Sequence, residues 1–437
     1  MISKAKFLAA ALVFFPFNCF AADFDLAAQS LTDVNAYPSP ELSAPNAPAV
    51  KDWTVMVFVN GKNNLESSAL MDVNQMELVG TTGKVNIVVE LGRMKGQPEG
   101  DDSADGDWTG VRRYLITKDA DTERINSPVL DNRLNADMGS WKELADFVNW
   151  AKTRYPARRY ALILWDHGSG WKPLDPANTP DFANIKGFSL DDETGHEIST
   201  MQIGAALKAS GGVNFFMADG CNMQMASVAY ELKDYAEVMV ASEETEPGVV
   251  LRYAQFLTLL NDKPQSGAEE FGVYAVRTYR DYFLAGGDTE ETKLTQSAIR
   301  LGLITTLRAK LDGWVKLARN AEPETLRAAK AACKIYDDPE YKDLYHFVSL
   351  VTAGTNDAAL RASGEDVMGF FKTRFIIENW SQHPDSHGMS IYVPDVYDPL
   401  YDKLAWSRDG DWDDFSKFMA ASFGSPAPAR PVTPRRK

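Results

Sequence analysis

The sequence predicts an α/β protein with a mainly parallel central sheet, followed by a mostly helical C-terminal region. From residue 53 to about 260, short apolar runs bounded by turn residues alternate with amphipathic helical periods. Such runs are typical of strands buried on both faces of a parallel sheet, and the alternation is typical of a doubly wound fold. After about residue 265 helical periods dominate. With 437 residues, 45% of them hydrophobic, the chain is long enough for one large or two ordinary cores.

The N-terminal segment, residues 1–21, is a predicted secretory signal peptide. Two lysines precede an apolar stretch over residues 7–17, and Cys19 and Ala21 supply the small residues of a cleavage site. We therefore expect an exported protein, either periplasmic or secreted. Cleavage would remove two lysines and change the net charge from −16 to −18.

The flanking segments have little capacity to form a core. Residues 22–50, rich in Pro, Ala, Ser and Asn, are predicted to be an extended leader, and residues 426–437 a basic tail. No segment after the signal peptide is long and apolar enough to span a bilayer. The acidic mature chain makes nucleic acid an improbable partner, and we expect a monomer that binds protein or peptide substrates.

A first domain is predicted over residues 51–262. Its strands are short runs rich in Val, Ile, Leu or aromatic residues, and its helices carry apolar residues on one face. The predicted strands cover residues 53–59, 85–90, 111–116, 160–165, 213–218 and 238–241, and the helices cover 65–79, 141–151, 200–207 and 223–232.

The C-terminal region, residues 263–425, is predicted to be mostly helical. Its helical periods cover residues 268–283, 306–321, 324–332, 367–380 and 412–423, and its strand-like pieces cover 294–301 and 389–393.

Two of the predicted strands end on a residue that can take part in covalent chemistry. The strand over 160–165 leads to His167, and the strand over 213–218 leads to Cys221. Because ligands bind at the carboxyl ends of parallel strands, both side chains are expected at the same rim of the sheet. A base beside a thiol makes a candidate site for a cysteine nucleophile.

The neighbours of these two residues suggest how the site would work. A helix beginning near Met223 would point its amino end at the sulfur and favour the thiolate, which is the reactive form. His167 would take the thiol proton and return it to a leaving amine. The N–H groups of Gly168 and Cys221 would bind an oxyanion, and Asp166 is a candidate for orienting the imidazole.

Each of these residues also has a purely structural interpretation. A cysteine in a core is usually a small hydrophobic residue, and a histidine at a strand end is often simply hydrogen-bonded. Cys333, which follows two alanines on a predicted helix, has only this interpretation. The combination of His167 and Cys221 at two strand ends favours a functional site.

Seven segments, in this order along the chain, resemble one known family. They are residues 53–58 (WTVMVF), 63–66 (NNLE), 137–139 (DMG), 162–171 (LILWDHGSGW), 219–221 (DGC), 240–248 (VASEETEPG) and 388–394 (GMSIYVP). Together they are similar to the clostripain family of cysteine peptidases, over roughly residues 50–425. The resemblance implies a caspase-like α/β/α sandwich for the first domain and a dyad with His167 as base and Cys221 as nucleophile. It also implies cleavage after Arg or Lys, with Asp219 near the pocket for the basic side chain.

The chain departs from the family pattern after the Glu-Pro-Gly turn. Val249 and Val250 follow that turn, where relatives usually have a tighter pattern of Gly and aromatic residues. If this loop helps to build the specificity pocket, the preference for a basic residue becomes an open question, and an apolar preference is the alternative.

The stretch between the two catalytic strands, residues 171–199, suggests two further features of the family. Relatives are commonly matured by cleavage there, and the bond after Lys186 is the candidate for cleavage by the protein itself. No cofactor is required for the predicted chemistry. Some relatives need calcium, and Asp191, Asp192 and Glu193 offer the oxygen ligands that this ion prefers.

Two other functions use the same scaffold. One is a non-catalytic exported binding or adhesion module, which would have no need of both His167 and Cys221. The other is a thiol hydrolase acting on a small amide, which would require a sealed cavity instead of an open groove.

Overall fold

The computed structural model of the protein describes residues 49–96, 101–172, 187–248, 250, 252–287 and 293–424. The predicted signal peptide, the basic tail and the candidate positions Lys186 and Val249 lie outside these residues, as does nearly all of the predicted leader. From residue 49 onward the described chain forms one compact unit.

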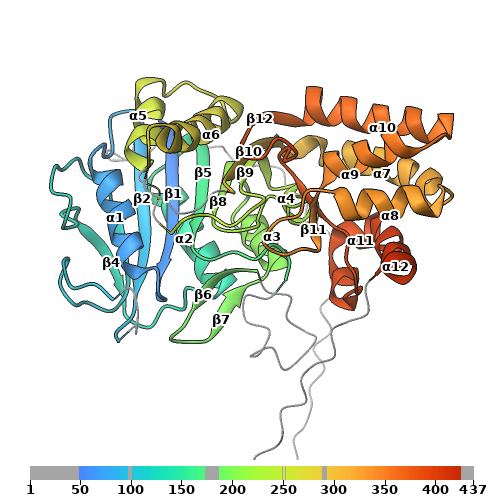
Figure 1. Ribbon diagram of the computed structural model, residues 1–437. Coiled ribbons are helices and arrows are strands. Elements are labelled where there is room, and N and C mark those ends of the chain that lie inside the picture. Colours follow the sequence, from blue (N-terminus) through green and yellow to red (C-terminus); the bar gives the residue numbers. More distant parts are fainter. Residues whose placement is uncertain are drawn as a thin grey trace, which may run out of the picture. The chain divides into compact units, whose positions relative to one another are not determined.

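A single sheet of nine strands runs through the described chain (Figure 1). Its strands lie in the order β12-β10-β9-β8-β5-β1-β2-β3-β4, and the central ones, from β9 to β2, are parallel. The strands are β1 (Lys51–Gly61), β2 (Val85–Arg93), β3 (Gly110–Leu115), β4 (Val129–Arg133), β5 (Ala157–Trp165), β8 (Val213–Asp219), β9 (Ala236–Ala241), β10 (Thr295–Arg300) and β12 (Ile376–Ser381). This arrangement confirms the predicted α/β class, the mainly parallel sheet and all six predicted strands of the first domain.

Both faces of the sheet are buried, which explains why its central strands are apolar along their whole length. Alternate residues of β1 enter two different cores, Met56 and Phe58 on one face and Val55, Val57 and Val59 on the other. Helices α1 (Glu66–Glu77), α5 (Tyr253–Asp262) and α6 (Ala268–Leu284) cover the second face. On the first face lie α2 (Trp141–Arg154), α3 (Thr200–Ala209) and α4 (Ala226–Leu232).

The C-terminal helices extend the first of these cores. They are α7 (Ile304–Ala318), α8 (Pro323–Ala332), α9 (Leu344–Gly354), α10 (Ala358–Phe370), α11 (Ala405–Asp409) and α12 (Trp412–Phe423). Figure 1 shows them, in orange and red, gathered on the β12 side of the sheet. This part of the chain is mostly helical, as predicted, yet it also supplies β10 and β12 to the central sheet. None of the described helices has the length and apolar character needed to cross a bilayer.

The predicted helix over residues 367–380 is wrong in its second half. Helix α10 ends at Phe370, a π-helical turn covers Phe371–Phe375, and residues 376–381 form the edge strand β12. Strand β12 pairs antiparallel with β10, which would otherwise expose its hydrogen-bonding groups. The π turn continues the helical spacing of apolar residues, so the sequence pattern does not show where the helix stops.

The predicted helix start near Met223 is also wrong. Asn222 adopts a left-handed backbone conformation with φ of 59°, which interrupts any helix. The N–H groups of Asn222 and Gln224 instead donate to the carbonyls of Glu244 and Ser242, at 3.1 and 2.8 Å. Helix α4 therefore begins only at Ala226.

Two small two-stranded sheets accompany the central one. Strands β6 (Phe188–Asp191) and β7 (His196–Ile198) form a hairpin within the stretch 171–199 between β5 and β8. Strands β11 (Tyr341–Asp343) and β13 (Ser390–Tyr392) pair in the C-terminal region.

Candidate active site

The ends of β5 and β8 bring His167 and Cys221 to the same rim of the sheet. The two strands are parallel neighbours, and Trp165 pairs with Asp219, so each candidate lies two residues beyond this pair. The following backbone segments touch, since a Cβ atom on Gly168 would lie 2.6 Å from the carbonyl oxygen of Cys221. Only glycine allows this approach. The predicted juxtaposition of base and thiol is thus present.

A cavity of about 240 Å³ opens beside the two side chains. His167 and Cys221 are both partly exposed, so the site is not sealed from solvent. The cavity is lined by Leu65, Asp72, Trp165, Asp166, His167, Asp219, Gly220, Cys221, Thr245, Glu246, Pro247, Gly248 and Val250.

The Cys221 thiol is neutral in this arrangement. Burial raises its pKa to about 12, although the backbone N–H of Glu246, which donates to Sγ at 3.3 Å, acts in the opposite direction. The expected helix amino end is absent here, because α4 begins five residues further along the chain. The thiol must therefore lose its proton to a base during the reaction instead of resting as a thiolate.

The hydrogen-bond partner of His167 is Asn64, not the expected Asp166. The imidazole Nε2 lies 2.7 Å from Oδ1 of Asn64, in the turn between β1 and α1. Burial lowers the pKa of His167 below 6.5, while the charge of Asp192 partly opposes this shift. The imidazole is therefore neutral near pH 7, as a general base must be.

Asp166 does not orient the imidazole. Its buried carboxylate accepts hydrogen bonds from the side chains of Asn60 and Asn63, at 2.9 and 2.7 Å. The carboxylate is therefore engaged by these two asparagines, and the imidazole Nε2 is bound by Asn64. Asn64 is the residue that our sequence reasoning missed, although it lies inside one of the recognised segments.

A backbone bridge joins the segment around Gly168 to the segment around Phe188. The bridge between Gly168 and Phe188 is made by the neighbouring residues, with Ser169 N–H donating to Gly187 O at 3.0 Å and Ser189 N–H to His167 O at 3.3 Å. The Gly168 N–H takes no part in this bridge. The assignment of Gly168 and Cys221 as oxyanion donors remains a prediction.

Asp219 lines the cavity, but its charge is already balanced. It forms an ion pair with the buried guanidinium of Arg252 and accepts a hydrogen bond from the Tyr253 hydroxyl at 2.5 Å. Arg252 also donates to Gln296 Oε1 at 2.7 Å. Asp219 alone is therefore a poor anchor for a substrate cation.

Two other acids line the same cavity, and neither was predicted as a site residue, although Glu246 lies inside the recognised segment 240–248. Asp72 Oδ2 accepts from Trp165 Nε1 at 2.8 Å, and Glu246 Oε1 accepts from Gln296 Nε2 at 2.8 Å. Within the described residues, no donor reaches Asp72 Oδ1 or Glu246 Oε2. Burial and the nearby charge of Asp219 raise the pKa of both carboxyls well above their usual range.

A contrasting set of polar groups, here called the Glu243 cluster, lies behind the wall of the cavity. Glu243 accepts from the Tyr336 hydroxyl at 2.6 Å, from Ser386 Oγ at 2.8 Å and from Gly388 N–H at 3.0 Å. Asp343, its acidic neighbour in the cluster, accepts from the N–H groups of His346 and His387, both at 2.6 Å. The cluster joins the C-terminal region to the segment that leads to Glu246, whose backbone N–H binds Cys221 Sγ.

The three acids considered for calcium are not arranged around a metal position. Asp191 is buried and accepts from Met138 N–H at 2.9 Å, and it lies 3.3 Å from Lys62 Nζ. Glu193 also binds Lys62, at 2.7 Å. In the described chain, no group of His, Cys, Asp and Glu side chains could hold a metal ion. The structure thus gives no support for a calcium site at Asp191, Asp192 and Glu193.

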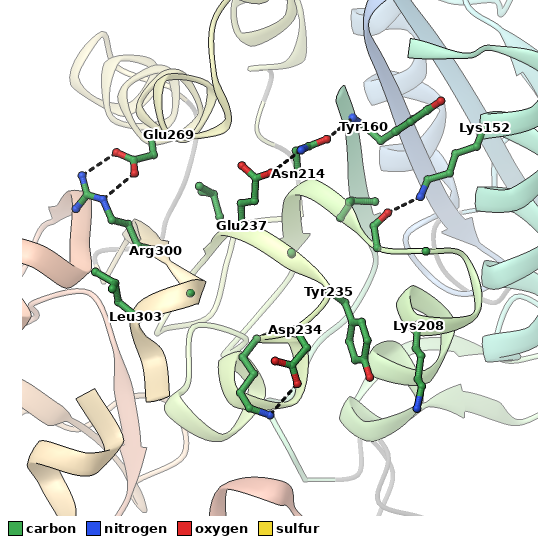
Figure 2. A pocket seen from close by; sticks show the side chains of 17 residues that line it. Lys152, Tyr160, Lys208, Asn214, Asp234, Tyr235, Glu237, Glu269, Arg300 and Leu303 are labelled. Atoms are coloured by element: carbon green, nitrogen blue, oxygen red, sulfur yellow. Dashed lines mark hydrogen bonds and ion pairs between the residues drawn. The ribbon is translucent and has the colours of Figure 1, made fainter. Parts of the chain in front are cut away.

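A larger hollow, of about 890 Å³, lies at the opposite ends of the central strands (Figure 2). Its charged side chains are mostly satisfied within the protein, as Arg300 pairs with Glu269 at 2.7 Å and Lys152 donates to Ser210 O at 2.7 Å. It lies at the amino ends of β8 and β9, where ligands of parallel sheets do not normally bind. We therefore place the active site at the other rim.

The protein thus has an α/β fold in which a thiol and an imidazole lie beside an acidic cavity, at the carboxyl ends of β5 and β8. The model of the clostripain family, peptidase family C11, matches residues 57–364. The chain belongs to this family, which confirms the resemblance found in the sequence.

The curated relative found is distant in sequence. Clostripain of Hathewaya histolytica is 25% identical over 219 residues, which are 46% of this chain and 40% of that relative. The chain thus spans less than half of the length of this curated relative.

Two solved structures share the fold. A secreted C11 cysteine protease from Bacteroides thetaiotaomicron, in complex with an irreversible peptide inhibitor, is 17% identical with a TM-score of 0.64. An inactive zymogen C11 protease from Parabacteroides distasonis is 17% identical with a TM-score of 0.58. Each comparison covers 83% of this chain and 99% of the other.

Proposed function

We propose that this chain is an exported cysteine endopeptidase that hydrolyses peptide bonds through a thioester on Cys221. The observation that carries the proposal is the meeting of Cys221 and His167 at one rim, beside a cavity with unsatisfied carboxyl oxygens. Export rests on the signal-like N-terminus, which lies outside the described residues, and on the secreted relative described above.

The reaction begins with attack of Cys221 on the carbonyl carbon of the scissile bond. A sulfur–carbon bond forms while the thiol proton passes to His167, and the N–H groups of Gly168 and Cys221 bind the oxyanion. The carbon–nitrogen bond then breaks, and His167 gives its proton to the leaving amine. Water attacks the thioester, with its proton taken by His167 and returned to the sulfur.

The primary test compares peptide hydrolysis by the wild type with hydrolysis by Cys221→Ala, using Cys333→Ala as the matched control. We expect activity to disappear in the first variant and to remain in the second, because Cys333 is buried away from the cavity. Iodoacetamide should also label Cys221 much faster than Cys333. Activity that survives in Cys221→Ala, or equal labelling of the two cysteines, would refute the nucleophile.

We further propose that substrates with Arg or Lys before the scissile bond are preferred. A guanidinium or ammonium group would supply the donors that Asp72 and Glu246 lack. Asp219 is already paired with Arg252, so it contributes only part of the binding of a substrate cation. Asp219→Asn should therefore only weaken the preference. A peptide-library profile favouring apolar residues would point instead to Val250, which lines the cavity, and to the neighbouring Val249.

Cleavage at Lys186 is proposed as a maturation step. Lys172, the other lysine of the stretch, is bound by Asp338 and Glu340 at 2.5 and 2.6 Å, which leaves Lys186 as the better candidate. Gly187 is buried and accepts a hydrogen bond from Ser169, so this segment must move before its bond is cut.

Intact-mass analysis tests this step. The wild type should be cut after Lys186, whereas Cys221→Ala and Lys186→Ala should stay whole and Lys172→Ala should still be cut. A wild type that is fully active and uncut would remove the maturation step and leave the dyad in place.

A further inference from the structure

The turn between β1 and α1 is fixed by two asparagines whose amides are fully used. Asn60 and Asn63 both donate to Asp166 and to the carbonyl of Leu190. Their amide oxygens accept from backbone N–H groups of the turn itself, at 3.0 Å for Asn60 and 2.9 Å for Asn63. The turn is therefore anchored to the residue that immediately precedes His167.

Asn64, the third asparagine of this turn, reaches the catalytic imidazole. Its side chain is exposed, and Oδ1 lies 2.7 Å from His167 Nε2. Consecutive residues of the turn thus bind consecutive residues of the strand end, Asn63 binding Asp166 and Asn64 binding His167. A displacement of either segment would change the direction of the imidazole ring.

This contact determines which nitrogen of His167 carries the proton. An amide oxygen only accepts hydrogen bonds, so Nε2 must be protonated to bind it. In the neutral imidazole the other nitrogen, Nδ1, then has a free lone pair. Nδ1 is the atom that remains to receive a proton from the thiol.

We propose that Asn64 is a positioning residue that holds His167 with its proton on Nε2, leaving Nδ1 to act as the base toward Cys221. The catalytic part of this inference rests on the proposed function, whereas the contact itself does not. Because the amide is neutral, it orients the ring without the charge that would hold a proton on it, and His167 remains able to release that proton to the leaving amine.

The first test separates positioning from a merely structural role. Asn64→Ala should lower kcat roughly 10- to 100-fold and leave KM nearly unchanged, because only the orientation of the base is lost. Asn64→Asp keeps an acceptor at the same place and should restore much of kcat. Its carboxylate should also move the acid limb of the kcat profile upward by about one pH unit, since a nearby opposite charge favours the imidazolium.

The second test does not depend on peptide hydrolysis. The titration of His167 is followed by NMR in Cys221→Ala protein, with and without Asn64→Asp, and the acids near this ring, Asp166 and Asp192, stay intact in both. The substitution should raise the pKa of His167 by about one unit. Asn320→Asp serves as the control, because the Asn320 amide binds Lys316 O at the end of α7, and it should cause no shift.

An unchanged His167 pKa in Asn64→Asp, or an unchanged kcat in Asn64→Ala, would overturn the proposal. If the wild type hydrolyses no peptide while the pKa shift is observed, the proposed function fails and the contact stands. The two failures are therefore distinguishable.

Discussion

Two groups of buried acids at this rim of the sheet differ in how completely the protein satisfies them. In the Glu243 cluster, both carboxyl oxygens of Glu243 accept hydrogen bonds from its own chain. In the cavity, Asp72 and Glu246 each keep an oxygen that no donor of the described chain reaches. A buried polar atom without a partner is costly, and these two oxygens remain available to accept hydrogen bonds from a bound group. The completed cluster instead fixes the wall behind it.

The largest effect is expected from removing the base beside the cavity. His167→Ala should slow peptide hydrolysis on the order of 10²-fold or more, because the thiol then has no group to take its proton. The thermal midpoint should stay close to that of the wild type, since His167 is partly exposed. Rate constants and melting curves of the same preparation check both points, and a normal rate would remove His167 from the mechanism.

Glu243→Ala should affect the free energy of unfolding more than any substitution of an acid in the cavity. It leaves the Gly388 N–H without its acceptor and removes the carboxylate to which the Tyr336 and Ser386 hydroxyls donate, at a cost of about 3 kcal/mol. Denaturant unfolding measures this loss, with Glu365→Ala as an exposed control. If the two variants were equally stable, the hydrogen bonds of the Glu243 cluster would not stabilise the fold as described.

Asp72→Asn should leave stability intact and should instead change substrate selectivity. The asparagine oxygen can still accept from Trp165 while the like-charge repulsion with Asp219 disappears, so stability should be unchanged or higher. Selectivity for Arg or Lys over uncharged residues should fall roughly tenfold, as expected for loss of one charged contact. Selectivity is measured as the ratio of kcat/KM values, and an unchanged ratio would exclude Asp72 from the specificity site.

The smallest effect concerns how kcat and KM each change as the pH is lowered. The pKa of His167 is lowered, so kcat should persist as the pH falls below 6.5 and decline only through that lowered value. The carboxyl pKa values of Asp72 and Glu246 are raised, so the cavity loses its charge at a higher pH than ordinary acids would. KM for basic substrates should therefore begin to rise at a higher pH than it would with ordinary carboxyls. Initial rates over a pH series check this, and a KM that does not change with pH would show that the acids do not bind the substrate.

The sequence predicted the parts of this molecule that depend on local pattern. Apolar runs placed the strands carrying His167 and Cys221, because residues buried on both faces must be apolar throughout. Asp72, Arg252 and Asn64 were not predicted, since their roles arise from contacts between segments far apart in the chain. The false helix start at Met223 has a related cause, because the left-handed Asn222 interrupts a pattern that looks helical in one dimension.

The position of β12 has a practical consequence for shortened versions of this protein. The family match ends at residue 364, but the sheet is completed only by residues 376–381. Ser386 and Gly388, which bind Glu243, lie still further along. An expression fragment trimmed to the recognised family boundaries would expose the edge of β10 and leave Glu243 with only Tyr336 of its three donors. Such a fragment would keep both His167 and Cys221 but would lose part of the framework around them.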